Sequence, residues 1–322
     1  MEIRDLEYFL VCCRTGSFTA AAREVHIVQS AMSSAVARLE HELGVSLFDR
    51  SVTPVAVTEH GRALQAGARR VLETVQATRD EVAAVSGRVT GPVILGCTLH
   101  TGPLDLAAVL AALRDRHPGV IVQLRQSITG SAGNLQAVAD GSMDIALTAD
   151  PGAPGSSAPP RGVRLSPLVS EPLVFVCPDG HPLGHRSGVT AADLAGQNIL
   201  RFPPGWGVRA AVEAVLGTDP SDIEIADYAL MLKLIRDGFG TTLLPASALA
   251  AGYPGLRSVP ADDPRLAWRL SAAVSASRQA TAATEALLTA LTQAAAHPTS
   301  PLPWTGSSPQ PAGRPAIGPG GR

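Results

Sequence analysis

Hydrophobic residues in the first 58 positions recur three and four residues apart, which is the spacing of amphipathic helices. Three short helices are predicted from this spacing, over residues 3–14, 19–25 and 30–43. Two short strand-like runs follow between residues 47 and 58, on either side of a turn at Thr53–Pro54. This order of elements predicts a helix-turn-helix followed by a β wing, in a first domain that covers residues 1–58.

Residues 59–88 contain no proline and are predicted to form one long helix, about 42 Å long at about 1.5 Å per residue. Its small and apolar residues follow a heptad spacing, with one polar member at Thr78. The apolar members of this seam are Leu64, Ala68, Val71, Val75, Val82 and Val85. A helix of this length with such a seam usually pairs with another helix, so we predict that it links the domains and dimerises. The alternative is a single helix packed on its own domain.

From residue 91 onward, β-rich runs alternate with amphipathic helices, which favours an α/β domain with a parallel sheet. A loop rich in Pro, Gly and Ser interrupts the pattern at residues 151–162, and the same alternation then repeats. The last strand and helix are predicted to return to the first half. The predicted effector domain, residues 89–296, therefore has two lobes with a cleft between them, lobe one at about 89–163 and 266–296 and lobe two at about 164–265. The tail, residues 297–322, holds seven Pro and five Gly and is predicted to be disordered.

Composition is that of a globular chain, with 45% hydrophobic and 17% charged residues among 322. The net formal charge is −2, so any contact with nucleic acid must come from local geometry rather than bulk charge. No apolar run is long enough to span a membrane, and the acidic N-terminus is not a secretory signal. The four cysteines form no CxxC pair, which argues against a zinc ribbon or a disulfide framework. We therefore expect a cytoplasmic protein with reduced thiols.

Against this background, the first 61 residues resemble LysR-type transcriptional regulators. The residues that carry the resemblance are Leu6, Phe9, Gly16, Ser17, Phe18, Ala21, Ala22, Gln29, Ser30, Ala31, Ser33, Leu39, Glu40, Leu43, Gly44, Leu47, Phe48, Arg50, Val55, Thr58 and Gly61. The segments RHPGV, DGSMDIAL and GFGTTLLP are similar to landmarks of that family's effector domain, so the resemblance extends to the tail.

The resemblance implies a winged helix-turn-helix, a dimerising linker helix and a two-lobed α/β domain similar to periplasmic binding proteins. It implies transcription control by a small-molecule effector. The implied partners are a pseudo-palindromic double-stranded DNA operator, further copies of the chain in a dimer or tetramer, and the effector, with RNA polymerase as a further candidate. The resemblance implies no catalytic residue, no cofactor and no metal.

DNA contacts are expected at the start of the third helix. A glutamine there can form hydrogen bonds with adenine, and a serine can form hydrogen bonds with bases or phosphates. Ser17 precedes a helix whose free N–H groups could bind a phosphate, and two arginines could reach the backbone or a base. The candidates are Ser17, Gln29, Ser30, Ser33, Ser34, Arg38 and Arg50. The alternatives are that Ser17 only caps its helix and that Ser33 only faces solvent.

Effector contacts are expected from residues that follow predicted strands in both lobes. The candidates are Thr98, His100, Thr101, Ser127, Thr129, Thr148, Phe202, Gly205 and Trp206. Hydroxyls and free backbone amides of this kind suit a small carboxylate or another small polar ligand. The alternatives are that the Thr and Ser residues cap helices, that His100 is a hydrogen-bonded loop residue, and that Trp206 covers the cleft.

Two other classes of protein remain as alternatives to a regulator. A solute-binding protein would use the same two-lobed fold, but the helix-turn-helix argues against it. An enzyme is disfavoured because the chain has no Walker A, HExxH, GxSxG or SxxK motif. The peroxide-sensing members of the family carry a pair of cysteines in the second lobe, and residues 198–210 contain none. Cys97 is left as a candidate thiol sensor, whereas Cys12 and Cys13 are expected to be packing residues.

Overall fold

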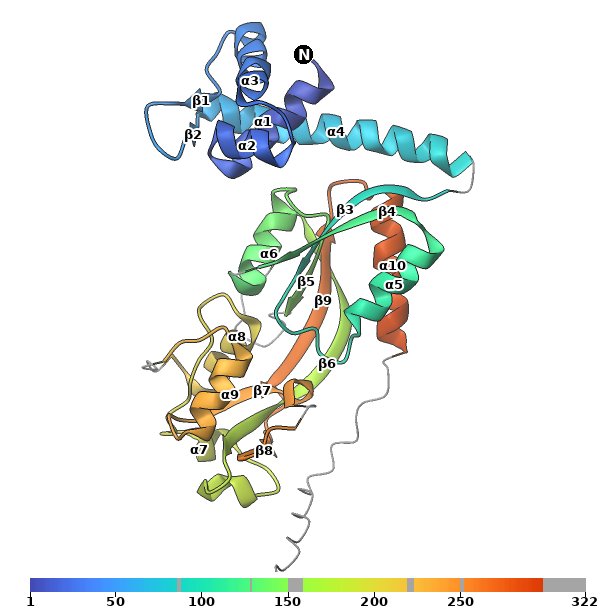
Figure 1. Cartoon of the computed structure of the whole chain (residues 1–322). Helices are drawn as coiled ribbons and strands as arrows, with labels where there is room; N and C mark the ends of the chain where they lie inside the picture. The colour runs from blue at the N-terminus through green and yellow to red at the C-terminus, as the bar shows by residue number, and fades with distance from the viewer. Residues whose placement is uncertain (86–87, 128, 150–158, 219–222, 250–251, 298–322) are drawn as a thin grey trace, which may run out of the picture.

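The computed structural model describes residues 1–85, 88–127, 129–149, 159–218, 223–249 and 252–297. A small helical unit at the N-terminus is followed by one long helix and by a two-lobed domain (Figure 1). The predicted disordered tail lies almost entirely outside the described residues, as does most of the predicted loop at 151–162. None of the described helices is long and apolar enough to cross a membrane.

The N-terminal unit is the predicted winged helix-turn-helix. Its elements are α1 (Ile3–Thr15), α2 (Phe18–Glu24), α3 (Gln29–Leu43), β1 (Phe48–Asp49) and β2 (Ala56–Val57). Gly16 ends α1 in the left-handed conformation with φ +60°, which glycine adopts without steric cost. The core forms because the wing strand buries Phe48 against Phe9 and Phe18, both with ring centroids 5.4 Å away.

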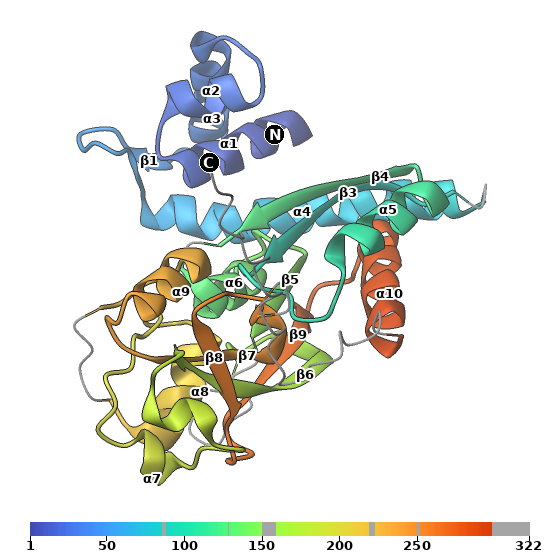
Figure 2. The same cartoon turned by 60° about the horizontal axis from the view of Figure 1, so that its bottom comes forward.

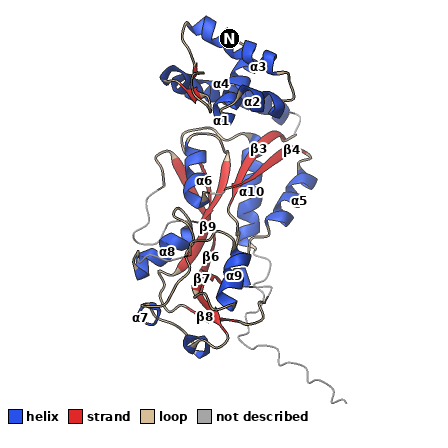
Figure 3. Cartoon of the chain, turned by 60° about the vertical axis from the view of Figure 1, so that its left-hand side comes forward, coloured by secondary structure: helices blue, strands red, loops and turns tan. Residues whose placement is uncertain are grey.

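Seven strands form one mixed sheet that runs through both lobes (Figure 3). They are β3 (Thr90–Cys97), β4 (Gly119–Gln126), β5 (Ile145–Ala149), β6 (Val163–Pro178), β7 (Thr242–Pro245), β8 (Leu256–Pro260) and β9 (Ala267–Ser275). The order is β4-β3-β5-β9-β6-β7, with β8 also paired to β6. Only β3 pairs in parallel, with β4 and β5, so the predicted parallel sheet is wrong for the rest.

The antiparallel pairing has a physical cause in the two crossover strands. β6 and β9 lie side by side over almost the whole of β9, from Val163↔Ser275 to Pro172↔Ala267. Each strand therefore serves both lobes, and the predicted return of the last strand to the first half is confirmed. A continuous strand that crosses between lobes needs no βα crossover helix, so it can pair in the antiparallel sense.

Helices cover both faces of the lobe-one sheet (Figures 1 and 2). The helices that follow the linker are α5 (Leu106–Arg116), α6 (Gly130–Ala139), α7 (Ala191–Leu194), α8 (Gly207–Leu216), α9 (Tyr228–Arg236) and α10 (Ala282–Ala296), with short 3₁₀ turns η1 (Pro182–His185) and η2 (Ala246–Leu249). Leu113 of α5 and Leu287 of α10 share a core with Leu147 of β5. Leu135 and Val138 of α6 pack on the opposite face.

Two predicted strands in lobe two are absent as strands within the described residues. The run at 197–202 forms isolated bridges, Ile199↔Thr241 and Arg201↔Glu224, and the run at 223–227 supplies only the second of these. Conversely, β8 was not predicted, because its sequence LRSVP holds two polar residues and a proline. The strand β8 pairs with β6 at the edge of the sheet, and a proline is tolerated in an edge strand.

Candidate DNA-binding surface and effector site

The start of α3 presents an exposed polar face. Gln29, Ser30 and Ser34 are exposed and Ser33 is half-buried, while Met32 and Leu39 on the other side of the helix are buried. The helix begins without a side-chain cap, so its first N–H groups are free to bind a phosphate or a base edge. The four predicted residues are thus brought together on one accessible surface.

Sequence reasoning missed Val28, which immediately precedes α3 and is 67% exposed. An exposed methyl-bearing side chain at this end of a recognition helix can contact the methyl group of thymine. The signal was present in the sequence as an apolar residue at a helix start, where a polar cap is the usual choice.

Ser17, Arg38 and Arg50 each have a structural partner. The Ser17 hydroxyl accepts a hydrogen bond from the Ala20 N–H at 3.3 Å, so it caps α2 as the alternative reading expected. The Arg38 Nε donates to Asp5 Oδ2 at 3.1 Å and joins α3 to the buried carboxylate of α1. Arg38 remains more than half exposed and still faces solvent.

Arg50 connects the wing to α3. Its guanidinium pairs with Glu40 at 2.9 Å and lies 4.9 Å from the centre of the Phe18 ring. The other oxygen of Glu40 accepts the Leu47 N–H at 2.8 Å, so one carboxylate positions both the strand and the arginine. Both arginines therefore bring little uncompensated positive charge to the DNA-facing surface.

The linker helix is α4 (Glu59–Val85), and its heptad seam is divided between two environments. Ala68 is buried and Leu64 is half-buried against α1 of the same chain, so these two members of the predicted dimer seam pack within their own unit. Val71 and Val82 are exposed, at 39% and 68%, and Val75 is partly exposed. The side chain of Val85 lies outside the described part of the structure.

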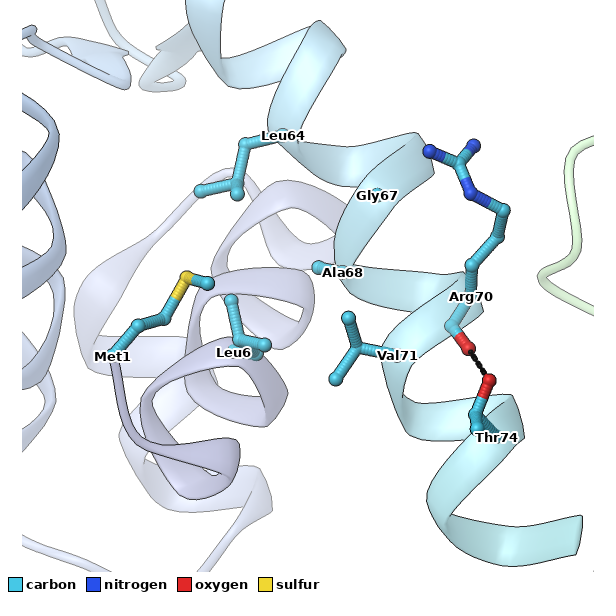
Figure 4. A pocket seen from close by; sticks show the side chains of 8 residues that line it. All are labelled: Met1, Leu6, Leu64, Gly67, Ala68, Arg70, Val71 and Thr74. Atoms are coloured by element: carbon cyan, nitrogen blue, oxygen red, sulfur yellow. Dashed lines mark hydrogen bonds between the residues drawn. The ribbon is translucent and has the colours of Figure 1, made fainter.

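A shallow hollow of about 300 Å³ lies where α1 meets α4 (Figure 4). Its lining residues come from both helices and are Met1, Leu6, Leu64, Gly67, Ala68, Arg70, Val71 and Thr74. The free surface of α4 thus continues onto α1, and any helix that pairs with α4 at this point also meets the DNA-binding unit.

Arg278 fastens α4 to lobe one. Its guanidinium pairs with Glu73 of α4 at 2.8 Å and donates to the carbonyls of Val138 and Met143 at 3.3 and 3.2 Å. Arg69 of α4 donates to the carbonyl of Asp140 beside it. We call the group Arg69, Glu73 and Arg278 with these carbonyls the linker clasp.

His100 lies at the centre of a partly buried polar contact between the lobes. Its Nε2 is 2.8 Å from the Ser247 Oγ and 3.8 Å from Glu171 Oε1. Ser247 in turn donates its hydroxyl to Glu171 Oε1 at 2.6 Å and its backbone N–H to Oε2 at 2.8 Å. Since His100 follows β3, Glu171 lies on β6 and Ser247 lies on η2, the contact joins lobe one, a crossover strand and lobe two.

Aromatic rings surround this contact and continue into lobe two. The His100 ring lies 5.5 Å from the ring of Tyr228 and 5.4 Å from that of Trp268. Phe202 lies 5.0 Å from Tyr228 and stacks on Trp206 at 5.7 Å. Burial, and next the charge of Glu171, raise the pKa of the Tyr228 hydroxyl, so it stays neutral at ordinary pH.

The predicted effector residues Gly205 and Trp206 meet lobe one at the start of α6. The carbonyl of Gly205 accepts the Ala132 N–H at 3.1 Å, and a side chain at Gly130 would lie 2.9 Å from that carbonyl. Ser127 and Thr129 are at the same place, with their hydroxyl oxygens 3.1 Å apart. These residues and the His100 contact therefore form one interlobe region, linked through Phe202 and Tyr228.

Three other predicted effector residues have local roles. Thr98 donates its hydroxyl to the His100 carbonyl at 2.8 Å, and Thr101 donates to that of Leu104 at 3.0 Å, so both shape the loop that carries His100. Thr148 is fully buried under α6, and its hydroxyl has no hydrogen-bond partner in the described part of the structure. Glu171, Tyr228, Ser247 and Trp268 were missed, although an acid within the apolar run of β6 was a visible signal.

Three of the four cysteines, Cys12, Cys97 and Cys177, are buried, and Cys13 is partly buried. Burial raises the pKa of Cys12 and Cys177 to about 11 and that of Cys13 to about 12. It raises the pKa of Cys97 as well. Because the thiolate is the form that reacts with oxidants, these cysteines are poor candidates for redox chemistry at neutral pH.

Comparison with known proteins places both parts of the chain in one family. Residues 3–62 match the family described as bacterial regulatory helix-turn-helix protein, lysR family, and residues 86–296 match the LysR substrate binding domain. A probable hydrogen peroxide-inducible genes activator of Streptomyces viridosporus is 31% identical over 254 residues, 77% of this chain and 78% of the relative. The transcriptional regulator CbbR of Sinorhizobium medicae is 29% identical over 256 residues, 77% of this chain and 78% of that protein.

Solved structures share the fold. A full-length OxyR variant from Pseudomonas aeruginosa superposes with a TM-score of 0.73 at 24% identity, over 92% of this chain and 97% of that one. Full-length CbnR in complex with its target DNA superposes with a TM-score of 0.57 at 20% identity, over 91% and 99%. The matched relatives are regulators rather than enzymes. The chain belongs to the LysR family and is a DNA-binding transcriptional regulator with a substrate-binding effector domain.

Proposed function

We propose that the protein binds a pseudo-palindromic operator in the cytoplasm as a dimer or tetramer, with α3 of each copy in a major groove. The observation that carries this proposal is the uncapped, exposed start of α3, where Val28, Gln29, Ser30 and Ser34 face solvent. The exposed part of the α4 seam supports pairing with a second copy, which would set the spacing of two recognition helices.

A small molecule bound between the lobes would control this regulator. The interlobe region combines side chains of both lobes and both crossover strands, so a ligand bound there would contact both lobes at once. Such a ligand can shift the protein only through different affinities for the open and closed arrangements. The altered angle between DNA-binding units would then change the DNA footprint and the access of RNA polymerase.

Reversible binding, rather than thiol oxidation, is the mode of control that the chain supports. Relatives named for hydrogen peroxide are similar to this chain, but residues 198–210 hold no cysteine and the four thiols are buried or partly buried. Burial raises the pKa of the Cys177 thiol to about 11, so the reactive thiolate is disfavoured at pH 7.

A footprint on the DNA beside the protein's own gene, at low and at physiological salt, tests the DNA-binding proposal. We expect two protected half-sites separated by one or more helical turns. Gln29→Ala should weaken the footprint, whereas His41→Ala, an exposed change at the far end of α3, should leave it intact. Absence of protection at both salt concentrations, or equal effects of the two variants, contradicts the proposed role of α3.

A further inference from the structure

The interlobe contact around His100 is a preformed niche for a nitrogen base. Two aromatic rings, Tyr228 and Trp268, lie against the imidazole, and its Nε2 meets the Ser247 hydroxyl with Glu171 directly behind. We call the surround of Glu171, Tyr228, Ser247 and Trp268 the imidazole niche. It is shaped and charged for the ring that the chain itself places there.

Several features show that this niche is built rather than incidental. Only 4% of the chain is aromatic, yet two rings of the niche are continued by Phe202 and Trp206 in the same interlobe region. The loop that carries His100 approaches so closely that a side chain at Gly102, where φ is +63°, would lie 2.7 Å from Trp268. The Glu171 side chain is 11% exposed and holds its position by accepting two hydrogen bonds from Ser247.

The charge of the niche is negative. The charged side chain that contacts His100 in the described part of the chain is the carboxylate of Glu171, and the Tyr228 hydroxyl beside it is neutral. A carboxylate ligand would therefore meet a half-buried like charge, which is costly where water screens poorly. A cation gains from the carboxylate of Glu171 and from the two neighbouring aromatic rings, Tyr228 and Trp268.

On these grounds we propose that the effector is recognised through a protonated organic nitrogen, an amine or an imidazolium-type ring, that takes the place of His100 in the imidazole niche. The inference rests on the proposed control by a ligand between the lobes and adds the class of that ligand. It replaces the expectation of a carboxylate effector. Release of His100 would break the direct contact of its loop with Ser247 of lobe two, so ligand binding and lobe movement are coupled.

Chemical complementation of the full-length chain tests the proposal. His100→Ala empties the niche, and the probes are imidazole, at a pH that protonates it, and propionate as an anion of similar size. We expect imidazolium to bind His100→Ala at least about tenfold more tightly than the unaltered chain, seen by calorimetry and by tryptophan fluorescence. Adding Glu171→Gln should weaken that binding by about ten- to a hundredfold, since a charge-assisted contact is lost.

His185→Ala, an exposed histidine change in lobe two, is the matched control and should create no imidazolium site. Preference of His100→Ala for propionate, or equal binding with and without Glu171, would overturn the proposal. If His100→Ala does not fold, the single variant Glu171→Gln, which keeps His100, is compared with the unaltered chain. Glu171→Gln must bind imidazolium more weakly than the unaltered chain does, and equal affinity refutes the inference. A normal operator footprint together with a niche that does not bind cations contradicts only the proposed class of ligand. Loss of the footprint itself contradicts the proposed function as a regulator.

Discussion

Replacement of Arg278 by methionine tests whether the linker clasp joins α4 to the effector domain. Methionine keeps a long apolar side chain but removes all the donors of the guanidinium. The change therefore removes the pairing with Glu73 at 2.8 Å and the two hydrogen bonds to the carbonyls of Val138 and Met143.

The expected cost follows from the exposure of each contact. The pair with Glu73 is partly exposed, 20% at the arginine and 30% at the glutamate, so it contributes about 0.5–1 kcal/mol. The Val138 carbonyl keeps the Gly141 N–H at 3.2 Å, but the Met143 carbonyl loses a donor at a cost of about 1–3 kcal/mol. The Nε of Arg278 is buried without a hydrogen-bond partner among the described residues, and losing this unpaired group offsets part of the cost. We expect destabilisation of about 2–3 kcal/mol.

Calorimetry of the full-length chain provides the assay. A loss of about 2–3 kcal/mol should lower the melting temperature of the effector domain by about 4–12 °C. Glu73→Gln is the matched control, because it removes only the ion pair and should cost about 0.5–1 kcal/mol. An Arg278→Met variant no less stable than Glu73→Gln would show that the carbonyl contacts contribute nothing and would refute this reasoning.

The same variant has a predicted pH dependence through Asp144. Burial raises the pKa of Asp144, and the charge of Arg278 opposes that rise. A carboxyl group whose pKa is raised in the folded state contributes its full stabilisation of the fold at pH values below its pKa in the unfolded chain. That contribution is lost as the pH rises through the folded-state pKa. Without Arg278 the folded pKa rises further, so the stability deficit of Arg278→Met should be larger at pH 7 than at pH 4. A deficit that is constant, or smaller at pH 7, contradicts this coupling.

Three further predictions concern DNA, assembly and redox chemistry. Ser34→Arg should strengthen operator binding at low salt and steepen the salt dependence by about one unit in the log–log slope, because it adds one phosphate contact; an unchanged slope in salt titrations argues against that contact. Val82→Glu should shift the protein towards monomer in light scattering, whereas Arg79→Glu, exposed but off the seam, should not; equal effects would show that the seam does not mediate pairing. Hydrogen peroxide should leave the Cys177 thiol reduced, as seen by alkylation after the treated protein is denatured, and the footprint unchanged; rapid oxidation at neutral pH would contradict its raised pKa.

The N-terminal fold was predictable because its determinants are local. Helix periodicity, Gly16 after α1 and the wing turn all lie within a few residues of the elements that they define. The serines of α3 were predicted to bind DNA because they lie at the start of that helix, and Ser30 and Ser34 are exposed there. The partners of Arg38 and Arg50 could not be predicted, because the sequence does not show which acidic residue lies near an arginine in the fold. Asp5, for example, lies 33 residues from Arg38 in the sequence.

The interlobe region was predicted only in part, because its contacts join distant positions. His100 was selected as a residue after a strand, but Ser247 is 147 residues away and reaches it only through the crossover of β6 and β9. The predicted carboxylate effector rested on side-chain hydroxyls and free backbone amides. Two of these hydroxyls, on Thr98 and Thr101, are engaged by backbone carbonyls, and the charge of the region is set by Glu171.

Strand β9 connects the imidazole niche to the linker clasp. Trp268, next to its first residue, lies against His100, and Ser275 at its other end accepts the N–H of Arg278 at 3.1 Å. β9 is hydrogen-bonded to β6 over most of its length and to β5 in its second half, so its two ends belong to one continuously paired strand. The niche holds side chains of both lobes, whereas the clasp holds only lobe one and α4. If a ligand changes the lobe angle at Trp268, β9 is the continuous strand that joins this position to the clasp, so we expect Arg278→Met to reduce the effect of the ligand on the DNA footprint.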